Sequence, residues 1–344
     1  MKIWQESYGI TKAGKPVSKF FLQNETGTTA VIMDYGVTLL ELHYGGKDVV
    51  LGYETLQDYE AGEIYVGATV GRFAGPIPYG KLMLNGVEYQ LTQNDGPHHL
   101  HGGITGFSRK VWDSSILEDG VRFSMCAAHG EDGYPGQLQV SVTCRLTETD
   151  GLHYIYDAVS DKDTVLNMTC HAYFNLEGHD SGTALEHLAQ SPAEFYRVEE
   201  PAGIPQPKLF GVKDTPFDFT TPHTFRQDLH TPHPQLDPRV GYDRNAYLGQ
   251  GGVWKKAAWI QAPGSGITLE VTTTQTGLQF FCPGYILEDR PRGKGGVQYM
   301  PYCAFCMETQ HCLSPQDAEK GQIYPVLPAG QHYHSETIYQ LGGK

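Results

Sequence analysis

The sequence predicts an all-β protein, built as one large antiparallel β-sandwich with few short helices. Tyrosine (21 residues), phenylalanine (14) and glycine (41) are plentiful, whereas long helical periods are scarce. Many segments alternate between apolar and polar residues, as half-buried strands do. Glycine, proline and asparagine recur at strand-length intervals, where turns need them. Together these features are typical of a sandwich.

Local patterns locate the individual elements. Residues 81–84 and 87–91 flank Asn85-Gly86, a pair that suits a type I′ turn, so we expect a hairpin there. Helices are expected only near residues 56–61 and 184–190. Strands are expected at residues 28–33, 37–44, 121–128, 138–146, 164–176 and 266–274.

The domain organisation depends on how the segment 199–234 is interpreted. Its seven prolines are compatible with a linker between two domains. No matched cores flank it, so a long loop decorating one domain is the better interpretation. All-β sandwiches often run long as one unit, and we therefore expect residues 1–344 to form a single domain.

Charge and cysteine usage limit the partners and the compartment. The formal net charge is −14, which disfavours nucleic acid and anionic membranes as partners. Neither a signal peptide nor an apolar membrane span is recognisable. Seven scattered cysteines are typical of reduced thiols in a cytoplasmic protein. Cys303 and Cys306 have C-x-x-C spacing, but strand-like flanks favour core thiols over a redox or zinc site.

The segment 164–176, TVLNMTCHAYFNL, is the first candidate for a functional site. As a strand it would have one apolar face and one face of hydrogen-bonding groups. A solvated face usually carries lysine and glutamate, so a polar groove explains the second face better. The residues of this polar face are Asn167, Thr169, His171, Tyr173 and Asn175.

Glu308 is the second candidate, in the strand-like segment FCMETQH at 305–311. Glutamate is unfavourable inside a strand. Taken alone, however, such a residue is more often salt-bridged or at a sheet edge than catalytic.

Three histidines within four residues, His98, His99 and His101, raise the question of a metal site. His98 and His99 point apart on an extended chain, and no cysteine or H-x-x-E-H partner lies close by. We therefore expect no metal, with a site built on His99 and His101 as the minority alternative. Arg72 could be an ordinary surface arginine, but its small neighbours Gly67, Ala68 and Gly71 suggest a crowded site instead. Hydrolase-elbow, P-loop and dinucleotide motifs are absent from the sequence.

Taken in order, several of these motifs resemble the aldose 1-epimerase (galactose mutarotase) family. Each match is weak alone, but their shared order along most of the chain is specific. The matching motifs are DVVLGY at 48–53, VGATVGRFA at 66–74, LHGG at 100–103, GYPG at 133–136, HAYFNL at 171–176, TPFDF at 215–219 and ETQ at 308–310.

The resemblance implies a galactose mutarotase-like supersandwich with a sugar groove on one sheet. It implies that Glu308 removes the C1 hydroxyl proton, that His171 protonates the ring oxygen, and that His101 hydrogen-bonds the substrate near that oxygen. No cofactor is implied, and the partner is a small sugar. Positions that match the family's sugar-binding segments are Arg72, Asp243, Gln279 and Phe281.

Acid–base chemistry fits the implied reaction, because ring opening needs one proton removed and one supplied. We expect a rate that requires ionised Glu308 and protonated His171, with the carboxylate helping His171 to keep its proton to higher pH. The family pattern changes at Gly75-Pro76, at Arg244 and after residue 311, which leaves the sugar open. Arg244 raises the possibility of a phosphorylated sugar.

Three other functions remain open from the sequence. A glycoside hydrolase would need a second carboxylate, for which Asp243 is a candidate. A non-catalytic sugar-binding module would not need both His171 and Glu308. A metal site on His99 and His101 is the third. The oligomeric state is expected to be a monomer or a weak homodimer.

Overall fold

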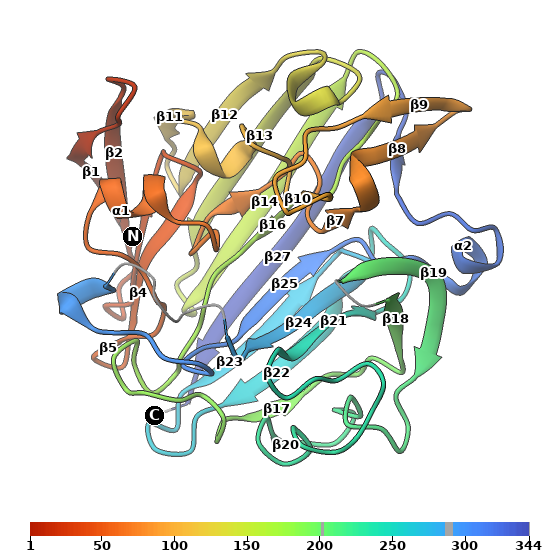
Figure 1. The fold of residues 1–344 in the computed structure, drawn as a ribbon. Coiled ribbons are helices and arrows are strands. Elements are labelled where there is room, and N and C mark those ends of the chain that lie inside the picture. Colours follow the sequence, from red (N-terminus) through yellow and green to blue (C-terminus); the bar gives the residue numbers. More distant parts are fainter. Residues whose placement is uncertain (201–202, 286–291, 344) are drawn as a thin grey trace.

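The computed structural model describes residues 1–200, 203–285 and 292–343, and within them a nine-stranded antiparallel sheet crosses the molecule diagonally (Figure 1). Its strands, in spatial order, are β11 (Asp113–Ile116), β12 (Val121–Ala127), β13 (Leu138–Leu146), β14 (Gly151–Ser160), β27 (His332–Gly342), β23 (Thr268–Thr273), β22 (Lys255–Gln261), β17 (Leu188–Gln190) and β20 (His223–Thr224).

A second, five-stranded sheet lies in front of the large sheet in this view (Figure 1). Its order is β19 (Ile204–Gly211), β18 (Phe195–Glu200), β21 (Gly241–Tyr247), β24 (Gly277–Pro283) and β25 (Cys306–Gln310). A third sheet is formed by the N-terminal strands β1 (Lys2–Ile10), β2 (Pro16–Gln23), β3 (Thr29–Met33), β4 (Thr38–Tyr44) and β5 (Lys47–Asp48).

Short strand pairs and helices connect these sheets. The pairs are β6 (Thr69–Val70) with β16 (Thr169–Cys170), β7 (Pro76–Ile77) with β10 (His99–Leu100), β8 (Lys81–Leu84) with β9 (Val87–Gln90), and β15 (Thr164–Val165) with β26 (Val326–Leu327). The helices are α1 (Leu56–Ala61) and α2 (Pro315–Glu319), and single 3₁₀ turns lie at Pro78–Gly80, Phe107–Arg109, Glu131–Gly133 and Lys294–Gly296. Among the described helices, none combines the length and the apolar character that a membrane crossing needs.

The contact between the nine-stranded sheet and the five-stranded sheet of β25 decides which way the residues of β25 point. Thr309 on β25 and Thr337 on β27 share a buried hydroxyl contact of 2.6 Å. The hydroxyl of Tyr339 on β27 donates to the carbonyl of Met307 at 2.9 Å, and the Met307 side chain is buried in the core. Because side chains alternate across a strand, Glu308 faces away from the large sheet.

The predicted all-β fold class is confirmed, and so are most of its elements. β3, β4, β12, β13 and β23 lie within the segments predicted to be strands. The hairpin of β8 and β9 turns at Asn85 and Gly86, whose φ angles of 50° and 78° are those of a type I′ turn. Helix α1 begins after Thr55, which forms a capping box with Asp58.

Three predicted elements differ from the structure. Residues 184–190 are not helical, because their last three residues form β17 between β20 and β22, where Ala189 is fully buried. Sheet pairing there overrides a helix-favouring composition. The segment 199–234 is not a plain loop, since β19 and β20 lie within it. Residues 201–202 of that segment lie outside the described residues.

The segment 164–176 is also not a continuous strand. Only β15 and β16 are regular there, and every residue of the segment is buried. The polar side chains mostly hydrogen-bond to backbone: Tyr173 donates to Ile64 and Asn175 to Cys303. The predicted polar groove along this face is therefore wrong, because these groups stabilise crossing chains instead. His171 is the exception, and the following subsection describes its surroundings.

Asn167 connects three segments that surround His171, so its removal should destabilise the fold. Its amide donates to the carbonyl of Ala74 and its oxygen accepts from the backbone N–H of His311, both at 2.8 Å. Asn167→Ala leaves both buried groups unpaired, and we expect the free energy of unfolding to fall by at least about 2 kcal/mol in denaturant titrations. The exposed Gln93→Ala, which also loses a bond to a carbonyl, should change it by less than about 0.5 kcal/mol. Equal losses would contradict this role.

Candidate active site

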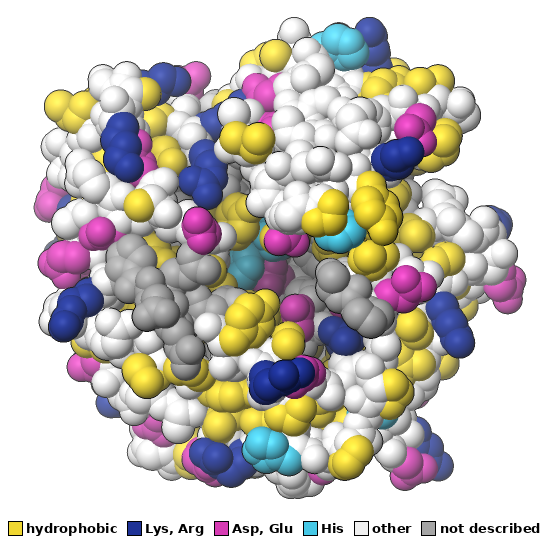
Figure 2. All heavy atoms as spheres, viewed as in Figure 1, with side chains coloured by type: hydrophobic (Ala, Val, Ile, Leu, Met, Phe, Trp, Pro, Cys, Tyr) yellow, Lys and Arg dark blue, Asp and Glu magenta, His cyan; other side chains and the backbone are white. Residues whose placement is uncertain are grey.

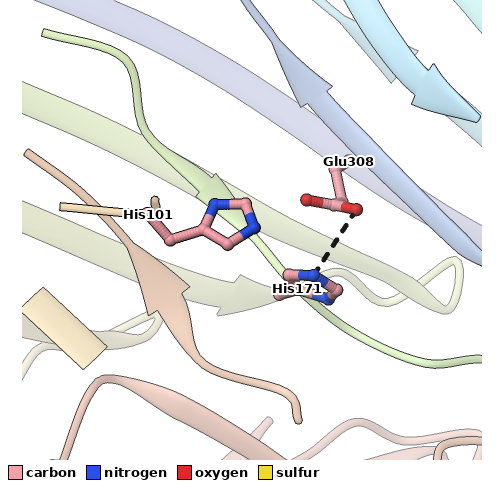
Figure 3. A group of neighbouring side chains, drawn as sticks. All are labelled: His101, His171 and Glu308. Carbon is pink, nitrogen blue, oxygen red and sulfur yellow. Dashed lines mark ion pairs between the residues drawn. The ribbon is translucent and has the colours of Figure 1, made fainter. Parts of the chain in front are cut away.

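Three side chains from distant parts of the chain converge on one point. Glu308 lies on β25, His171 follows β16, and His101 follows β10 (Figure 3). Nε2 of His171 lies 3.7 Å from Oε1 of Glu308, and one nitrogen or oxygen atom of each residue falls within 4.8 Å of the others. In Figure 2, histidine and acidic side chains are visible at the bottom of a hollow near the middle of this face. The three predicted catalytic residues therefore meet in one place.

The sheet register places Glu308 beside the predicted sugar-binding residues. Gln279 on β24 lies directly opposite Glu308, and Phe281 lies opposite Asp243 on β21. Paired residues of antiparallel strands share a face, as do alternate residues of one strand. Asp243, Gln279, Phe281 and Glu308 therefore occupy the same face of the five-stranded sheet, the face that points away from the large sheet.

Hydrogen bonds connect the polar members of this face. The amide nitrogen of Gln279 donates to Oδ1 of Asp243 at 2.5 Å, and Gln310 donates to Oε1 of Gln279 at 3.4 Å. Burial raises the pKa of Asp243 to about 6, and the charge of Glu199 adds to the rise. Among the described residues, Oε2 of Glu308 has no hydrogen-bond partner. This oxygen is the proton acceptor that the face leaves available.

Burial governs the protonation of Glu308 and His171. Their exposed fractions are 2% and 5%. Burial raises the pKa of Glu308 well above its usual range, and the charge of Asp243 raises it further. Burial lowers the pKa of His171 to about 4. Both shifts favour the uncharged form of each group, and in that form the pair holds one proton, on Glu308.

The expectation that a carboxylate keeps His171 protonated to higher pH is thus wrong for the free site. A neutral Glu308 offers no negative charge to an imidazolium, so desolvation alone sets the direction of the shift. The pair nevertheless holds the one proton that an acid–base exchange requires.

The tautomer of His101 follows from its backbone partner. The N–H of Gly75 donates to Nδ1 of His101 at 3.2 Å. Burial lowers the pKa of His101 well below its usual range, so the ring is neutral and carries its proton on Nε2. His101 is therefore a hydrogen-bond donor. The altered segment at Gly75-Pro76 thus contributes directly to the site, and Pro76 pairs with Leu100 beside His101.

The structure gives no support to a metal site on His99 and His101. Both ring nitrogens of His99 are engaged at 2.6 Å, Nδ1 with the carbonyl of Thr92 and Nε2 with the hydroxyl of Tyr134. The cluster of His101, His171 and Glu308 has the spacing of a metal site. However, the Nε2–H of His101 offers a proton where a metal needs a lone pair. The donor set fits hydrogen bonding better than metal binding.

Aromatic rings surround His171 on several sides. The ring of Tyr173 stacks on it with centroids 5.0 Å apart, and the ring of Phe281 meets it edge-on at 6.1 Å. Tyr65 lies 4.8 Å from the ring of His101 and 6.2 Å from that of His171. These rings desolvate His171, which accounts for its low pKa. Phe281 was among the predicted residues, whereas Tyr65, which has a φ of 55°, was not singled out from the sequence.

Arg72 is held by the backbone of a neighbouring loop. Its guanidinium donates to the carbonyls of Pro135 and Gly136 at 2.7 and 2.9 Å and to the hydroxyl of Thr164 at 3.2 Å. The residue is 2% exposed and lies beside the ring of Tyr134. The small residue before Arg72 has a separate cause, because a methyl group on Gly71 would lie 2.3 Å from the ring of Phe107. Sugar binding by Arg72 stays a prediction.

Cys306 is a member of the site that sequence reasoning assigned only to the core. Its sulfur lies 3.7 Å from Nδ1 of His171, on the side of the ring away from Glu308. Cys306 lies opposite Phe281 and two residues before Glu308, so it belongs to the same sheet face. Cys303 and Cys306 are both buried free thiols, as predicted.

With this geometry in place, comparison with known proteins identifies the family. A model of the aldose 1-epimerase family matches residues 18–340. The chain belongs to the aldose 1-epimerase family. Galactose mutarotase from Sus scrofa is 35% identical over 331 residues, covering 94% of this chain and 93% of its own. Aldose 1-epimerase from Haemophilus influenzae is 34% identical over 337 residues, covering 95% and 96%.

Solved structures agree with this assignment. Galactose 1-epimerase from Lactobacillus acidophilus superimposes with a TM-score of 0.84 at 26% identity and covers 99% of both chains. The aldose epimerase homologue from C. elegans gives a TM-score of 0.83 at 27% identity, covering 94% of this chain and 99% of its own. The predicted family, the fold and the assignment to isomerases are thereby confirmed.

Gly102 provides a test of how tightly the loop of His101 is positioned. A methyl group on Gly102 would lie 1.7 Å from the carbonyl oxygen of Gly71, and its φ is +89°. Gly102→Ala should therefore displace His101, reduce the epimerase rate and lower the free energy of unfolding by about 1–3 kcal/mol or more.

Gly130→Ala is the matched control for this variant. Gly130 has a similar φ of +83°, but no atom lies within 4 Å of the added methyl group. Gly130→Ala should lower the free energy of unfolding through backbone strain but leave the epimerase rate unchanged. Equal rates in the two variants would contradict a positioning role for the Gly102 contact.

Proposed function

We propose that this chain interconverts the α and β anomers of a free hexose such as galactose or glucose. One observation carries the proposal. A buried carboxyl with an unpartnered oxygen, Glu308, faces the imidazole of His171 across a gap of 3.7 Å. Such a pair can remove one proton from a substrate and supply another at a second atom.

The chemistry needs ring opening, rotation about the C1–C2 bond and closure on the other face. In the proposed reaction, Glu308 takes the proton from O1 while His171 gives one to the ring oxygen, and closure reverses both transfers. Each such transfer contributes roughly 10²- to 10⁴-fold in rate. His101 donates its Nε2–H to the substrate near the ring oxygen. No redox change occurs, so the reaction needs no cofactor.

The proposed reactive form is a tautomer of the uncharged form that burial favours in the free site. Moving the proton from Glu308 to His171 creates the carboxylate base and the imidazolium acid without taking up a proton from solvent. A bound sugar adds hydroxyl groups that stabilise this ion pair. Gln279 and Asp243 are proposed to bind sugar hydroxyls, with Phe281 lining the pocket and Arg72 completing the predicted set.

A free sugar suits the site better than a phosphorylated one. Arg244 follows Asp243 directly, so it points to the opposite face of its strand. Its Nη1 lies 3.3 Å from Oε2 of Glu199, whose other oxygen lies 2.9 Å from Arg197. The charge of Arg244 is thus shared with a buried carboxylate. The relatives named galactose mutarotase and aldose 1-epimerase support an unmodified aldose.

The other functions considered from the sequence find less support. A hydrolase would use Asp243 as the second carboxylate, yet Gln279 lies between the strands of Asp243 and Glu308 and bonds to Asp243. A binding module has no need for a proton shared between buried Glu308 and His171. Release of sugar from glycosides would favour the hydrolase over the epimerase.

We further propose that residues 1–344 act as one domain, as a monomer or weak homodimer. Seven free thiols suit a reducing compartment such as the cytoplasm.

Optical rotation tests the proposed reaction directly. Freshly dissolved crystalline α-galactose or α-glucose relaxes to its anomeric equilibrium, and the protein should accelerate this relaxation. Glucose 6-phosphate serves as the comparison for an anionic substrate and should be accelerated less. Failure to accelerate any of these sugars would refute the proposed function.

Glu308→Gln should abolish the acceleration, because an amide cannot accept the O1 proton. Gln has nearly the same shape, so far-ultraviolet circular dichroism should be unchanged. The control Glu336→Gln removes a carboxylate from the outer face of the large sheet and should keep wild-type activity. Full activity in Glu308→Gln would contradict its role as the base.

The pH profile of kcat/KM should be bell-shaped. Below about pH 4 His171 becomes protonated while Glu308 keeps its own proton. Neither group can then accept the O1 proton, so no base is available. Above the raised pKa of Glu308 the pair loses its only proton, so no acid is available. A plateau therefore begins near pH 4 and ends well above the usual pKa of glutamate. A kcat/KM that falls at neither the acid nor the alkaline end of the profile would contradict the proposal that Glu308 and His171 share one proton.

A further inference from the structure

The imidazole of His171 has a second polar neighbour besides Glu308. Sγ of Cys306 lies 3.7 Å from Nδ1 of the ring, and Oε1 of Glu308 lies 3.7 Å from Nε2. Cys306 and Glu308 are two residues apart on β25, so both project from the same face of that strand. The two ring nitrogens of His171 therefore each face a side chain of one strand.

The position of the shared proton decides the direction of the contact with sulfur. In the uncharged form of the pair, Glu308 holds its proton and Nε2 of His171 is the nitrogen that can accept it. A neutral imidazole then carries its single proton on the other nitrogen, Nδ1, and the sulfur of Cys306 is the acceptor. A thiol that donated to Nδ1 would instead put the ring proton on Nε2 and block transfer from Glu308.

Burial keeps the sulfur of Cys306 uncharged. The residue is fully buried, and burial raises the pKa of its thiol well above the usual value, with a further rise from the charge of Glu308. The sulfur of a neutral thiol is a weak hydrogen-bond acceptor. A carboxylate or thiolate at this position would stabilise the imidazolium and keep His171 charged. The neutral thiol can therefore orient the ring without making it a permanent cation.

Other ionisable groups surround the ring on the described elements packed against it. They include the carboxyl of Glu308 with Asp243 beyond it, the imidazole of His101, and the phenols of Tyr65 and Tyr173. Burial dominates the pKa of His171 and lowers it to about 4, opposed by a hydrogen bond to the residue's own backbone. Among the described side chains, only Cys306 lies within hydrogen-bonding distance of Nδ1. The thiol is thus the side-chain group placed to select between the two ring tautomers.

We propose that Cys306 is a positioning residue, whose sulfur accepts the Nδ1–H of His171, fixes this tautomer and directs the free Nε2 toward Glu308. When the ring becomes the imidazolium acid of the proposed reaction, Nδ1 keeps its proton and Nε2 alone exchanges. The bond to sulfur therefore persists through both proton transfers. The inference rests on the proposed function only for its effect on the rate, because the tautomer exists without substrate.

The ¹⁵N signals of the His171 ring test the tautomer directly in the full-length protein without substrate. Protonated and unprotonated imidazole nitrogens have well-separated shifts, and the absence of the signals in His171→Gln assigns them. At neutral pH, wild type should show a protonated Nδ1 and an unprotonated Nε2. Cys306→Ala should lose this preference, because the acceptor of Nδ1–H is gone.

Cys282→Ala is the matched control for this variant. Cys282 is equally buried, on the neighbouring strand β24, but its side chain belongs to the main core cluster. Removal of its sulfur should leave the tautomer of His171 as in wild type.

The epimerase rate should respond through kcat and not through KM. Cys306 lies on the side of the His171 ring away from Glu308, so its loss removes no contact to the substrate. Cys306→Ala should lower kcat roughly 3- to 10-fold, the equivalent of one hydrogen bond, and leave KM unchanged. The acid limb of its pH profile should move to lower pH, because the imidazolium loses an acceptor. Cys282→Ala should keep the kcat and the profile of wild type.

Several results would overturn the role of Cys306. A wild-type ring protonated on Nε2, alone or together with Nδ1, would do so without any variant. An unchanged tautomer in Cys306→Ala, or equal losses of kcat in Cys306→Ala and Cys282→Ala, would show that the thiol only fills space. If the tautomers behave as expected but no sugar is epimerised, the proposed function fails while the contact of Cys306 with His171 stands.

Discussion

The burial of Glu308 is the constraint on which the site depends. A carboxyl group with 2% exposure resists ionisation, because its charge would lose the solvation of water. The fold surrounds it with a neutral His171 and with Gln279, neither of which forces it to ionise. In the uncharged form of the pair, Glu308 holds one proton and His171 offers a free nitrogen 3.7 Å away. An exposed glutamate at this position would be permanently charged and could not hold that proton.

The sandwich architecture produces this burial through strand alternation. Thr309 and Met307 attach β25 to the large sheet, which turns Glu308 to the opposite face. Loops from the N-terminal half then cover that face. His101 is oriented by Gly75, and Cys306 contacts the far nitrogen of His171. Packing of the core and orientation of the acid–base pair therefore rest on the same alternation of residues within one strand.

Much of this was predictable from the sequence, and the failures have physical reasons. Local signals sufficed for the strands, the Asn85-Gly86 turn and the position of Glu308 in a strand. Residues 184–190 failed because long-range pairing overrides local helix preference. The polar row around His171 was predicted, but not that its members bond to crossing backbones. The pairing of Arg244 with Glu199, 45 residues apart, has no signature in the sequence. Desolvation of His171 likewise depends on rings from distant segments.

Site-specific titration of Glu308 tests the central claim most directly. The carboxyl carbon signal of ¹³C-labelled protein, assigned by its absence in Glu308→Gln, reports the protonation of this one side chain. In the free protein the account predicts that Glu308 stays protonated to a pH well above the usual glutamate range, while His171 stays neutral down to about pH 4. A Glu308 that ionises near its ordinary pKa, beside a His171 that is protonated at neutral pH, would contradict it.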